Sequence, residues 1–200
     1  DYALNFISRH KNQPFFCYIP YNACHTPIQC PDELFKKYKK LKLDNYNAGI
    51  YAMLENVDYN LGRIKTHLKE LDLLDNTIII FLSDNGANML PPLFKRYNAN
   101  LRGWKGTIHE GGNRVPMFMS WSKNLEPGLI INEISAHIDL LPTIFELCKL
   151  PIPKTLPLDG KSLIPLLKRK GEEWPERYIF THFYIHRLSN LFRKSMLIIR

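Results

Sequence analysis

A long amphipathic helix followed closely by a β-branched strand is the feature that most constrains the fold. Between residues 46 and 71 apolar side chains recur every three or four positions, which predicts a helix with one buried stripe. Residues 77–82 then read Thr-Ile-Ile-Ile-Phe-Leu and predict a central strand. Two further apolar runs, 15–19 and 115–121, also indicate buried strands. Strands that alternate with helices predict an α/β fold with a mainly parallel sheet sandwiched between helices.

Shorter elements complete this organisation. Apolar spacing and helix-start residues predict a short helix over 2–10, a solvated helix or loop over 31–43, and a helix that begins at Asp139 with Pro142 in its first turn. The composition of the chain changes at the short, aromatic-rich stretch 178–183. Residues 196–199 indicate a strand whose partners would lie beyond Arg200.

Composition excludes several classes of protein. With 45% hydrophobic and 23% charged residues the chain is globular, and no apolar run is long enough to span a bilayer. The net charge of +8 favours anionic partners. The lysines cluster in 31–43, where only Phe35 and Tyr38 interleave as aromatics, so we expect a solvated surface and no nucleic-acid binding there.

The cysteines form neither a disulfide framework nor a zinc motif. The spacings of Cys17, Cys24, Cys30 and Cys148 match no metal pattern. A bond between Cys24 and Cys30 and two free thiols are both compatible with the sequence, with free thiols slightly favoured.

Polar residues follow two of the predicted strands. His25 comes after residues 15–19, and Asp84 with Asn85 comes directly after residues 77–82. Ligands gather at the carboxyl ends of parallel strands, and these hard oxygen donors suit calcium or magnesium. An Asp-Asn-Gly sequence is also common in plain turns, which is the alternative for this segment.

A second candidate site is the loop around Lys105. This lysine stands between Gly103 and Gly106, where the backbone can approach a bound anion closely, although the spacing is not that of a P-loop. His137 and Asp139 are expected to be a packed histidine and a helix cap. His182 and His186 are four residues apart, but a pair without a third ligand is weak support for a metal site.

Six stretches, in this order, resemble the sulfatases of the alkaline-phosphatase superfamily, of the arylsulfatase and glycosaminoglycan-sulfatase kind. They are distributed along most of the chain, between residues 14 and 163, and are Pro14–Pro27, Asn76–Gly86, Leu101–Thr107, Glu110–Pro116, His137–Thr143 and Leu158–Leu163. The resemblance implies an alkaline-phosphatase-like fold and hydrolysis of a sulfate monoester, from a small molecule or a glycan, at a divalent cation.

The resemblance also implies a role for each candidate residue. Asp84 and Asn85 would bind calcium, with magnesium as a second choice. Lys105 would bind the sulfate, and His25 would contact the bridging oxygen of the leaving group. Such proteins act outside the cytoplasm, as secreted, lysosomal or periplasmic enzymes.

The family nucleophile is a formylglycine made in a Cys/Ser-x-Pro-x-Arg motif, and this sequence contains no such motif. The paired aspartates that complete the family's metal site are missing as well. We therefore expect a sulfatase fragment, truncated at both ends and inactive alone, with the formylglycine in the missing N-terminal part. Residues 1–175 would be the C-terminal portion of the catalytic domain, and residues 176–200 the start of a smaller subdomain.

Two other functions remain open from the sequence. A phosphoester or phosphonate hydrolase of the same superfamily would share the metal scaffold. A non-catalytic protein that binds sulfated glycans through its positive charge would keep the fold without the nucleophile.

Overall fold

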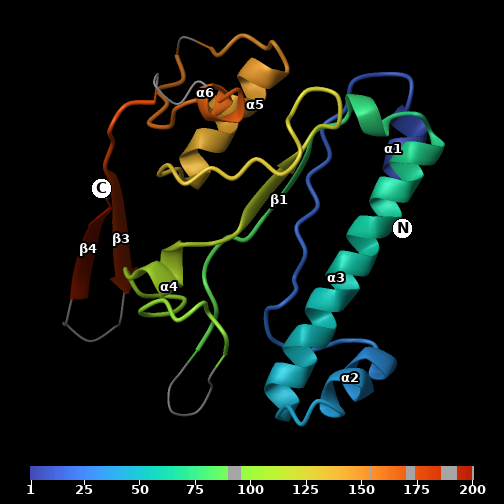
Figure 1. Ribbon diagram of the computed structural model, residues 1–200, viewed down its shortest axis with the longest axis vertical. Helices are drawn as coiled ribbons and strands as arrows, with labels where there is room; N and C mark the ends of the chain where they lie inside the picture. Colours follow the sequence, from blue (N-terminus) through green and yellow to red (C-terminus); the bar gives the residue numbers. More distant parts are fainter. Residues whose placement is uncertain (90–95, 154, 170–173, 186–192, 200) are drawn as a thin grey trace. The chain divides into compact units, whose positions relative to one another are not determined.

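A computed structural model describes residues 1–89, 96–153, 155–169, 174–185 and 193–199, with backbone alone from residue 182 onward. The chain divides into two compact units, shown in Figure 1. The first contains residues 1–79 and 89–96, and the second contains 80–88 and 97–200.

The first unit is organised by α3 (Asn45–Glu70), the predicted long helix. Its apolar stripe is buried, including Ile50, Met53 and Leu68, which confirms the helical periodicity. The carboxylate of Asp44 accepts a hydrogen bond from the backbone N–H of Asn47 at 2.9 Å and so caps the first turn. The 3₁₀ turn η1 (Leu74–Asn76) follows the helix.

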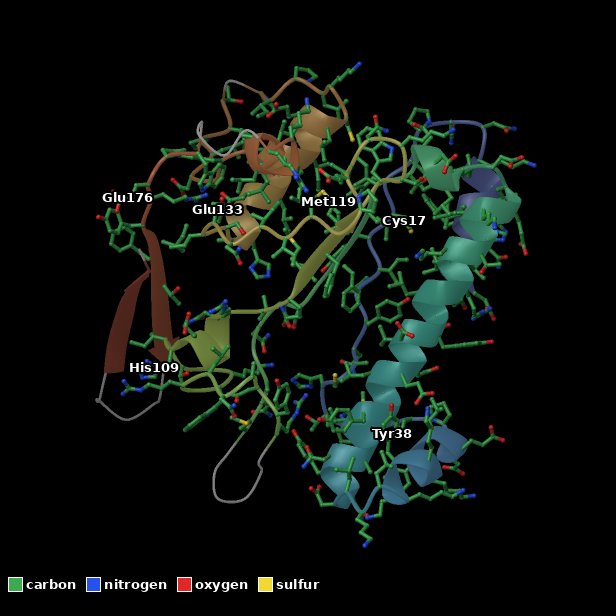
Figure 2. All side chains as sticks on the ribbon, in the orientation of Figure 1. Cys17, Tyr38, His109, Met119, Glu133 and Glu176 are labelled. Carbon is green, nitrogen blue, oxygen red and sulfur yellow. The ribbon has the colours of Figure 1, made fainter. Side chains whose placement is uncertain are left out.

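Two short helices pack against α3 (Figure 1). The predicted helix α1 (Tyr2–His10) lies along its C-terminal half, where Ser8 Oγ is 2.8 Å from His67 Nε2. The lysine-rich segment forms α2 (Asp32–Lys39), which packs on the N-terminal half through the Lys37–Glu55 ion pair at 2.7 Å. Tyr38, labelled in Figure 2, stacks on the ring of Tyr51.

The strand predicted over residues 15–19 is wrong. The segment, with Cys17 at its centre (Figure 2), lacks the hydrogen-bonded ladder of a strand in the part of the chain that the structure describes. Burial alternates along it, and Phe16 and Tyr18 are 72% and 78% exposed. An apolar run can be read from the sequence, but a strand also needs a neighbouring backbone to accept and donate its hydrogen bonds.

The strands of the described residues form two separate pairs. β1 (Ile79–Leu82) pairs with β2 (Met117–Ser120), within the predicted runs 77–82 and 115–121. β3 (Ile179–Ile185) pairs antiparallel with β4 (Arg193–Ile199), with Ile179 opposite Ile199. The expectation that the terminal strand has its partners beyond Arg200 is therefore wrong, because β3 is its partner.

Three short helical elements contribute buried residues to the core of the second unit. These are the 3₁₀ turn η2 (His137–Asp139), α5 (Leu140–Leu147) and α6 (Ile164–Leu167). Buried Thr143 joins them, because its hydroxyl donates to the carbonyl of Asp139 and accepts from the backbone N–H of Leu163 at 2.9 Å. The helix predicted to begin at Asp139, with Pro142 in its first turn, is confirmed as α5.

Candidate functional site

The loop after β1 presents two side chains with oxygen donors, Asp84 and Asn85. Asp84 is exposed and Asn85 is half-buried. Within the described residues neither the Asp84 carboxylate nor the Asn85 carboxamide has a hydrogen-bond partner. The backbone beneath them is held, because Ser83 Oγ donates to the carbonyl of Asn85 at 2.9 Å and the N–H of Gly86 donates to the carbonyl of Gly112, also at 2.9 Å. The loop therefore displays unpaired oxygen donors on a fixed backbone.

The lysine loop is tied to the same segment. The backbone N–H of Lys105 donates to the carbonyl of Ala87 at 2.9 Å. Gly103 and Gly106, on either side of the lysine, have φ values of +83° and +82°, in the left-handed region that glycine tolerates best. The two glycines thus allow the turn that brings Lys105 beside the Asp84–Asn85 loop.

The helical turn α4 (Glu110–Asn113) packs tightly against both loops. A Cβ atom on Gly86 would overlap the carbonyl oxygen of Gly111, so only glycine permits this approach. The Asn113 carboxamide donates to the carbonyls of Ile108 and His109 at 2.7 and 3.2 Å, which closes the loop that follows Lys105. Close backbone packing therefore sets the spacing of the site.

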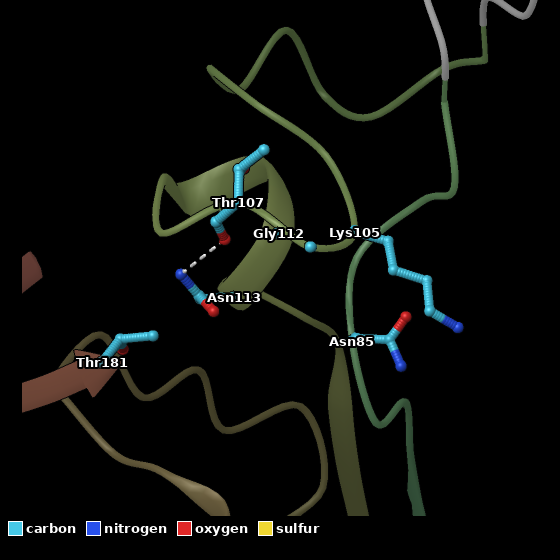
Figure 3. Close-up of a pocket in the computed structure, with 7 residues that line it drawn as sticks. Asn85, Lys105, Thr107, Gly112, Asn113 and Thr181 are labelled. Carbon is cyan, nitrogen blue, oxygen red and sulfur yellow. Dashed lines mark hydrogen bonds between the residues drawn. The ribbon is translucent and has the colours of Figure 1, made fainter. Parts of the chain in front are cut away.

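Asn85 and Lys105 line one pocket of about 280 Å³. Figure 3 shows the side chains of Asn85 and Lys105 extending in the same direction, away from Asn113 and Thr181. The complete lining is Asn85, Lys105, Gly106, Thr107, Gly112, Asn113 and Thr181. The structure therefore brings two of the four sequence-predicted site residues to one cavity, with Asp84 adjacent in the chain.

His25, the fourth predicted residue, belongs to the first unit. It is exposed, and its Nδ1 donates to the backbone carbonyl of Thr26 at 2.7 Å. With Nδ1 occupied as a donor, Nε2 is the ring nitrogen left to contact a ligand.

The residues present suit a hard divalent cation as part of a ligand set. The Asp84 carboxylate and the Asn85 carboxamide are oxygen donors of the kind that calcium prefers. Calcium takes six to eight oxygens, and no group of three or more His, Cys, Asp or Glu side chains arranged to hold a metal occurs among the described residues. The described residues could therefore supply only part of the ligand set of such a site.

Two features near the site were missed by sequence reasoning. His137 is not a packed histidine: it is exposed, and its Nε2 donates to the carbonyl of Ser83 at 2.9 Å. Asp139 precedes α5, yet its carboxylate makes no cap hydrogen bond to that helix and instead pairs with Arg177. Ser83 lies 54 residues from His137, and Arg177 lies 38 residues from Asp139. No local sequence pattern could therefore have indicated these contacts.

All four cysteines are free, which agrees with the favoured alternative for Cys24 and Cys30. Burial raises the pKa values of the Cys17, Cys24 and Cys30 thiols, and for Cys24 the nearby Arg96 opposes this effect. A raised pKa keeps a thiol protonated at neutral pH and makes it a poor nucleophile. The histidine pair His182 and His186 lies outside the residues whose side chains are described.

None of the helices in the described ranges is both long and apolar enough to cross a membrane.

Comparison with known proteins gives a consistent result. The sulfatase family profile matches residues 1–150, and the profile of the C-terminal part of N-sulphoglucosamine sulphohydrolase matches residues 103–198. The uncharacterized sulfatase YdeN of Escherichia coli is 39% identical over 183 residues, which are 88% of this chain and 31% of that protein.

Solved structures of similar fold support the same assignment. The crystal structure of Ps i-CgsB in complex with k-i-k-neocarrahexaose matches with a TM-score of 0.80 and 32% identity, over 93% of this chain and 40% of that one. The phosphonate monoester hydrolase SpPMH from Silicibacter pomeroyi shares the fold alone, with a TM-score of 0.54 and 21% identity over 92% of this chain and 31% of that one. These neighbours confirm the α/β, alkaline-phosphatase-like fold class.

The chain spans about a third of the length of the relatives that it matches. The family profile covers three quarters of the chain itself, and it includes Asp84, Asn85, Lys105 and His25. The chain belongs to the sulfatase family.

Proposed function

We propose that the protein containing this chain is a sulfuric ester hydrolase that cleaves sulfate monoesters at a divalent metal site. One observation carries the proposal: Asn85 and Lys105 line a common pocket, and the exposed Asp84 carboxylate stands next to Asn85 in the chain. A candidate metal-binding loop and a lysine at one cavity suit the transfer of an anionic group.

Asp84 and Asn85 are the proposed metal ligands, with calcium as the first choice and magnesium as the second. The metal would supply positive charge to the oxygens of the sulfate group. Lys105 would bind the same group from the pocket wall. Transfer of a sulfuryl group, like that of a phosphoryl group, depends mainly on positioning and on cations that face its oxygens.

His25 is the proposed contact of the leaving group. Its Nδ1–H is used by the Thr26 carbonyl, so in the imidazolium form the second proton, on Nε2, is the one that would pass to the departing oxygen. Protonation at that oxygen removes the cost of expelling an alkoxide.

The nucleophile is proposed to lie outside residues 1–200. No Cys/Ser-x-Pro-x-Arg motif occurs in the sequence, and burial disfavours the thiolate at three of the four cysteines. A formylglycine elsewhere in the protein would provide the attacking group. We also propose the domain boundary near residue 175, which is supported by the separate β3–β4 pair after residue 178.

A sulfated glycan or sulfated small molecule is the proposed substrate, and an extracytoplasmic location the proposed setting. The oligosaccharide bound to Ps i-CgsB supports a glycan. The +8 charge is compatible with an anionic polymer.

Phosphonate or phosphoester hydrolysis is the second candidate, since SpPMH shares the fold. The test compares matched 4-nitrophenyl sulfate, phosphate and phenylphosphonate esters with the full-length protein. We expect the sulfate ester to have the highest kcat/KM. A higher value for either phosphorus ester would reverse the assignment, and no turnover of any ester would favour the non-catalytic glycan-binding alternative.

A further inference from the structure

His137 contacts the candidate metal loop and is not one of the residues that line the pocket. Its Nε2 is 2.9 Å from the carbonyl oxygen of Ser83, the residue immediately before Asp84. A carbonyl oxygen only accepts, so Nε2 carries the proton and donates it to Ser83.

This hydrogen bond acts on the point from which the Asp84 side chain departs. The peptide unit between Ser83 and Asp84 is planar, so its carbonyl oxygen and the Cα atom of Asp84 move as one rigid group. Holding the oxygen therefore holds the position of the Asp84 Cα atom. The Ser83 N–H donates to the carbonyl of Pro116 at 3.3 Å, which restrains the other side of the same residue.

The segment that carries His137 is itself fixed. Asp139, at the other end of η2, is completely buried, and its carboxylate accepts from the backbone N–H groups of Ala136 and Lys161, each at 2.8 Å. Arg177 donates to both of its oxygens. His137 thus reaches Ser83 from a three-residue turn that is tied to the core.

We propose that His137 is a positioning residue for the metal site, which orients the Asp84 carboxylate through the carbonyl of Ser83. The inference rests on the proposed function, because it takes Asp84 as a metal ligand. It assigns to His137 a role that neither helix capping nor packing requires. Loss of a hydrogen bond that orients a metal ligand commonly lowers metal affinity by about 10–100-fold.

The test uses the full-length protein and a pair of variants that differ in reach. In His137→Gln the carboxamide N–H stands near the place of Nε2 and can donate to Ser83. In His137→Asn the same group is one methylene shorter. The control His10→Ala removes another imidazole that bonds a backbone carbonyl, that of Phe6 at 2.8 Å, within α1.

Calcium affinity is measured by calorimetry on metal-free protein, and amide hydrogen exchange is followed in peptides that cover residues 83–88. We expect His137→Asn to weaken calcium binding by about tenfold or more and to speed exchange in that segment. His137→Gln should stay within about threefold of the unchanged protein, and His10→Ala should match it. Equal effects of the Asn and Gln variants, or none, would overturn the proposal.

The exchange measurement separates this inference from the proposed function. If the unchanged protein binds no calcium, the assignment of Asp84 as a ligand fails, and the role of His137 at a metal fails with it. If calcium binds but the Asn and Gln variants bind it equally, the metal site stands and only the positioning role is lost. A variant whose second unit unfolds is recognised by loss of exchange protection in α5, and the Gln–Asn comparison is then made with His137→Ser in place of Asn.

Discussion

The carboxylate of Asp139 and the guanidinium of Arg177 form a buried ion pair in which one nitrogen, Nη1, lies 2.9 Å from each carboxylate oxygen. The Asp139 side chain is fully buried and that of Arg177 is 8% exposed. Arg177 also lies over the ring of Trp174, 5.5 Å from its centroid. Because Arg177 stands two residues before β3 and Asp139 ends η2, the pair ties the start of the β3–β4 hairpin to the turn that carries His137.

Replacement of Arg177 by Ala should therefore destabilise the second unit strongly. Removing one partner of a buried ion pair leaves an uncompensated charge and costs about 3–5 kcal/mol. The measurement is urea unfolding followed by tryptophan fluorescence. The matched control is Arg169→Ala, whose ion pair with Glu126 is 61% and 51% exposed and should contribute less than about 1 kcal/mol. If both variants lost the same free energy of unfolding, the buried ion pair would contribute no more to stability than the exposed one.

Asp84→Ala should remove bound metal and activity together, because it deletes the only carboxylate of the proposed ligand pair. Elemental analysis of the purified full-length variant measures the metal content. Asp58→Ala, at an exposed position on α3, is the control and should keep the full metal content. Stoichiometric metal in the Asp84 variant would rule out its assignment as a ligand.

Lys105→Ala should lower turnover of every sulfate ester to a similar extent, by about 10²–10³-fold, because a preorganised charge on the transferring group is lost. The change is measured as kcat on a 4-nitrophenyl sulfate and on an alkyl sulfate. A loss confined to one ester would place Lys105 at the leaving group and not at the sulfate.

His25→Ala should reduce turnover of the alkyl sulfate more than that of the 4-nitrophenyl sulfate, because a basic leaving oxygen depends more on protonation. The measurement is the ratio of the two kcat values in the variant against the unchanged protein. His10→Ala serves as the control histidine and should leave the ratio unchanged. An unaltered ratio in the His25 variant would exclude the leaving-group role.

The Asp44 cap makes the stability of the first unit depend on pH. The hydrogen bond from the backbone N–H of Asn47 holds the pKa of Asp44 below its ordinary value. A lowered carboxyl pKa contributes stability that is present above the unfolded-state pKa of about 3.9 and is lost as the pH falls through the folded-state value. Asp44→Ala should cost about 1 kcal/mol at pH 7, and the difference from the unchanged protein should shrink as the pH falls through the lowered folded-state pKa of Asp44. Helical circular dichroism during urea unfolding at pH 7 and at acidic pH measures it, and a difference that does not shrink at acidic pH would contradict the charged cap.

The sequence by itself determined the elements whose signals are local. The apolar spacing of 46–71 and the β-branched run 77–82 correspond to α3 and β1, because periodicity and side-chain shape act on neighbouring residues. Asp84, Asn85 and Lys105 could also be selected as candidates, since their residue types and flanking glycines suit the binding of a cation and an anion. Each of these inferences needed only a short window of the chain.

Tertiary structure decided what depends on distant partners. Residues 15–19 are apolar enough for a strand but find no ladder among the described residues, while residues 196–199 find theirs in β3. His137 and Asp139 look like a packed histidine and a helix cap, yet one reaches Ser83 and the other Arg177. Hydrogen bonds and ion pairs between residues far apart in sequence form only once the core has brought the segments together, and a local pattern carries no record of them.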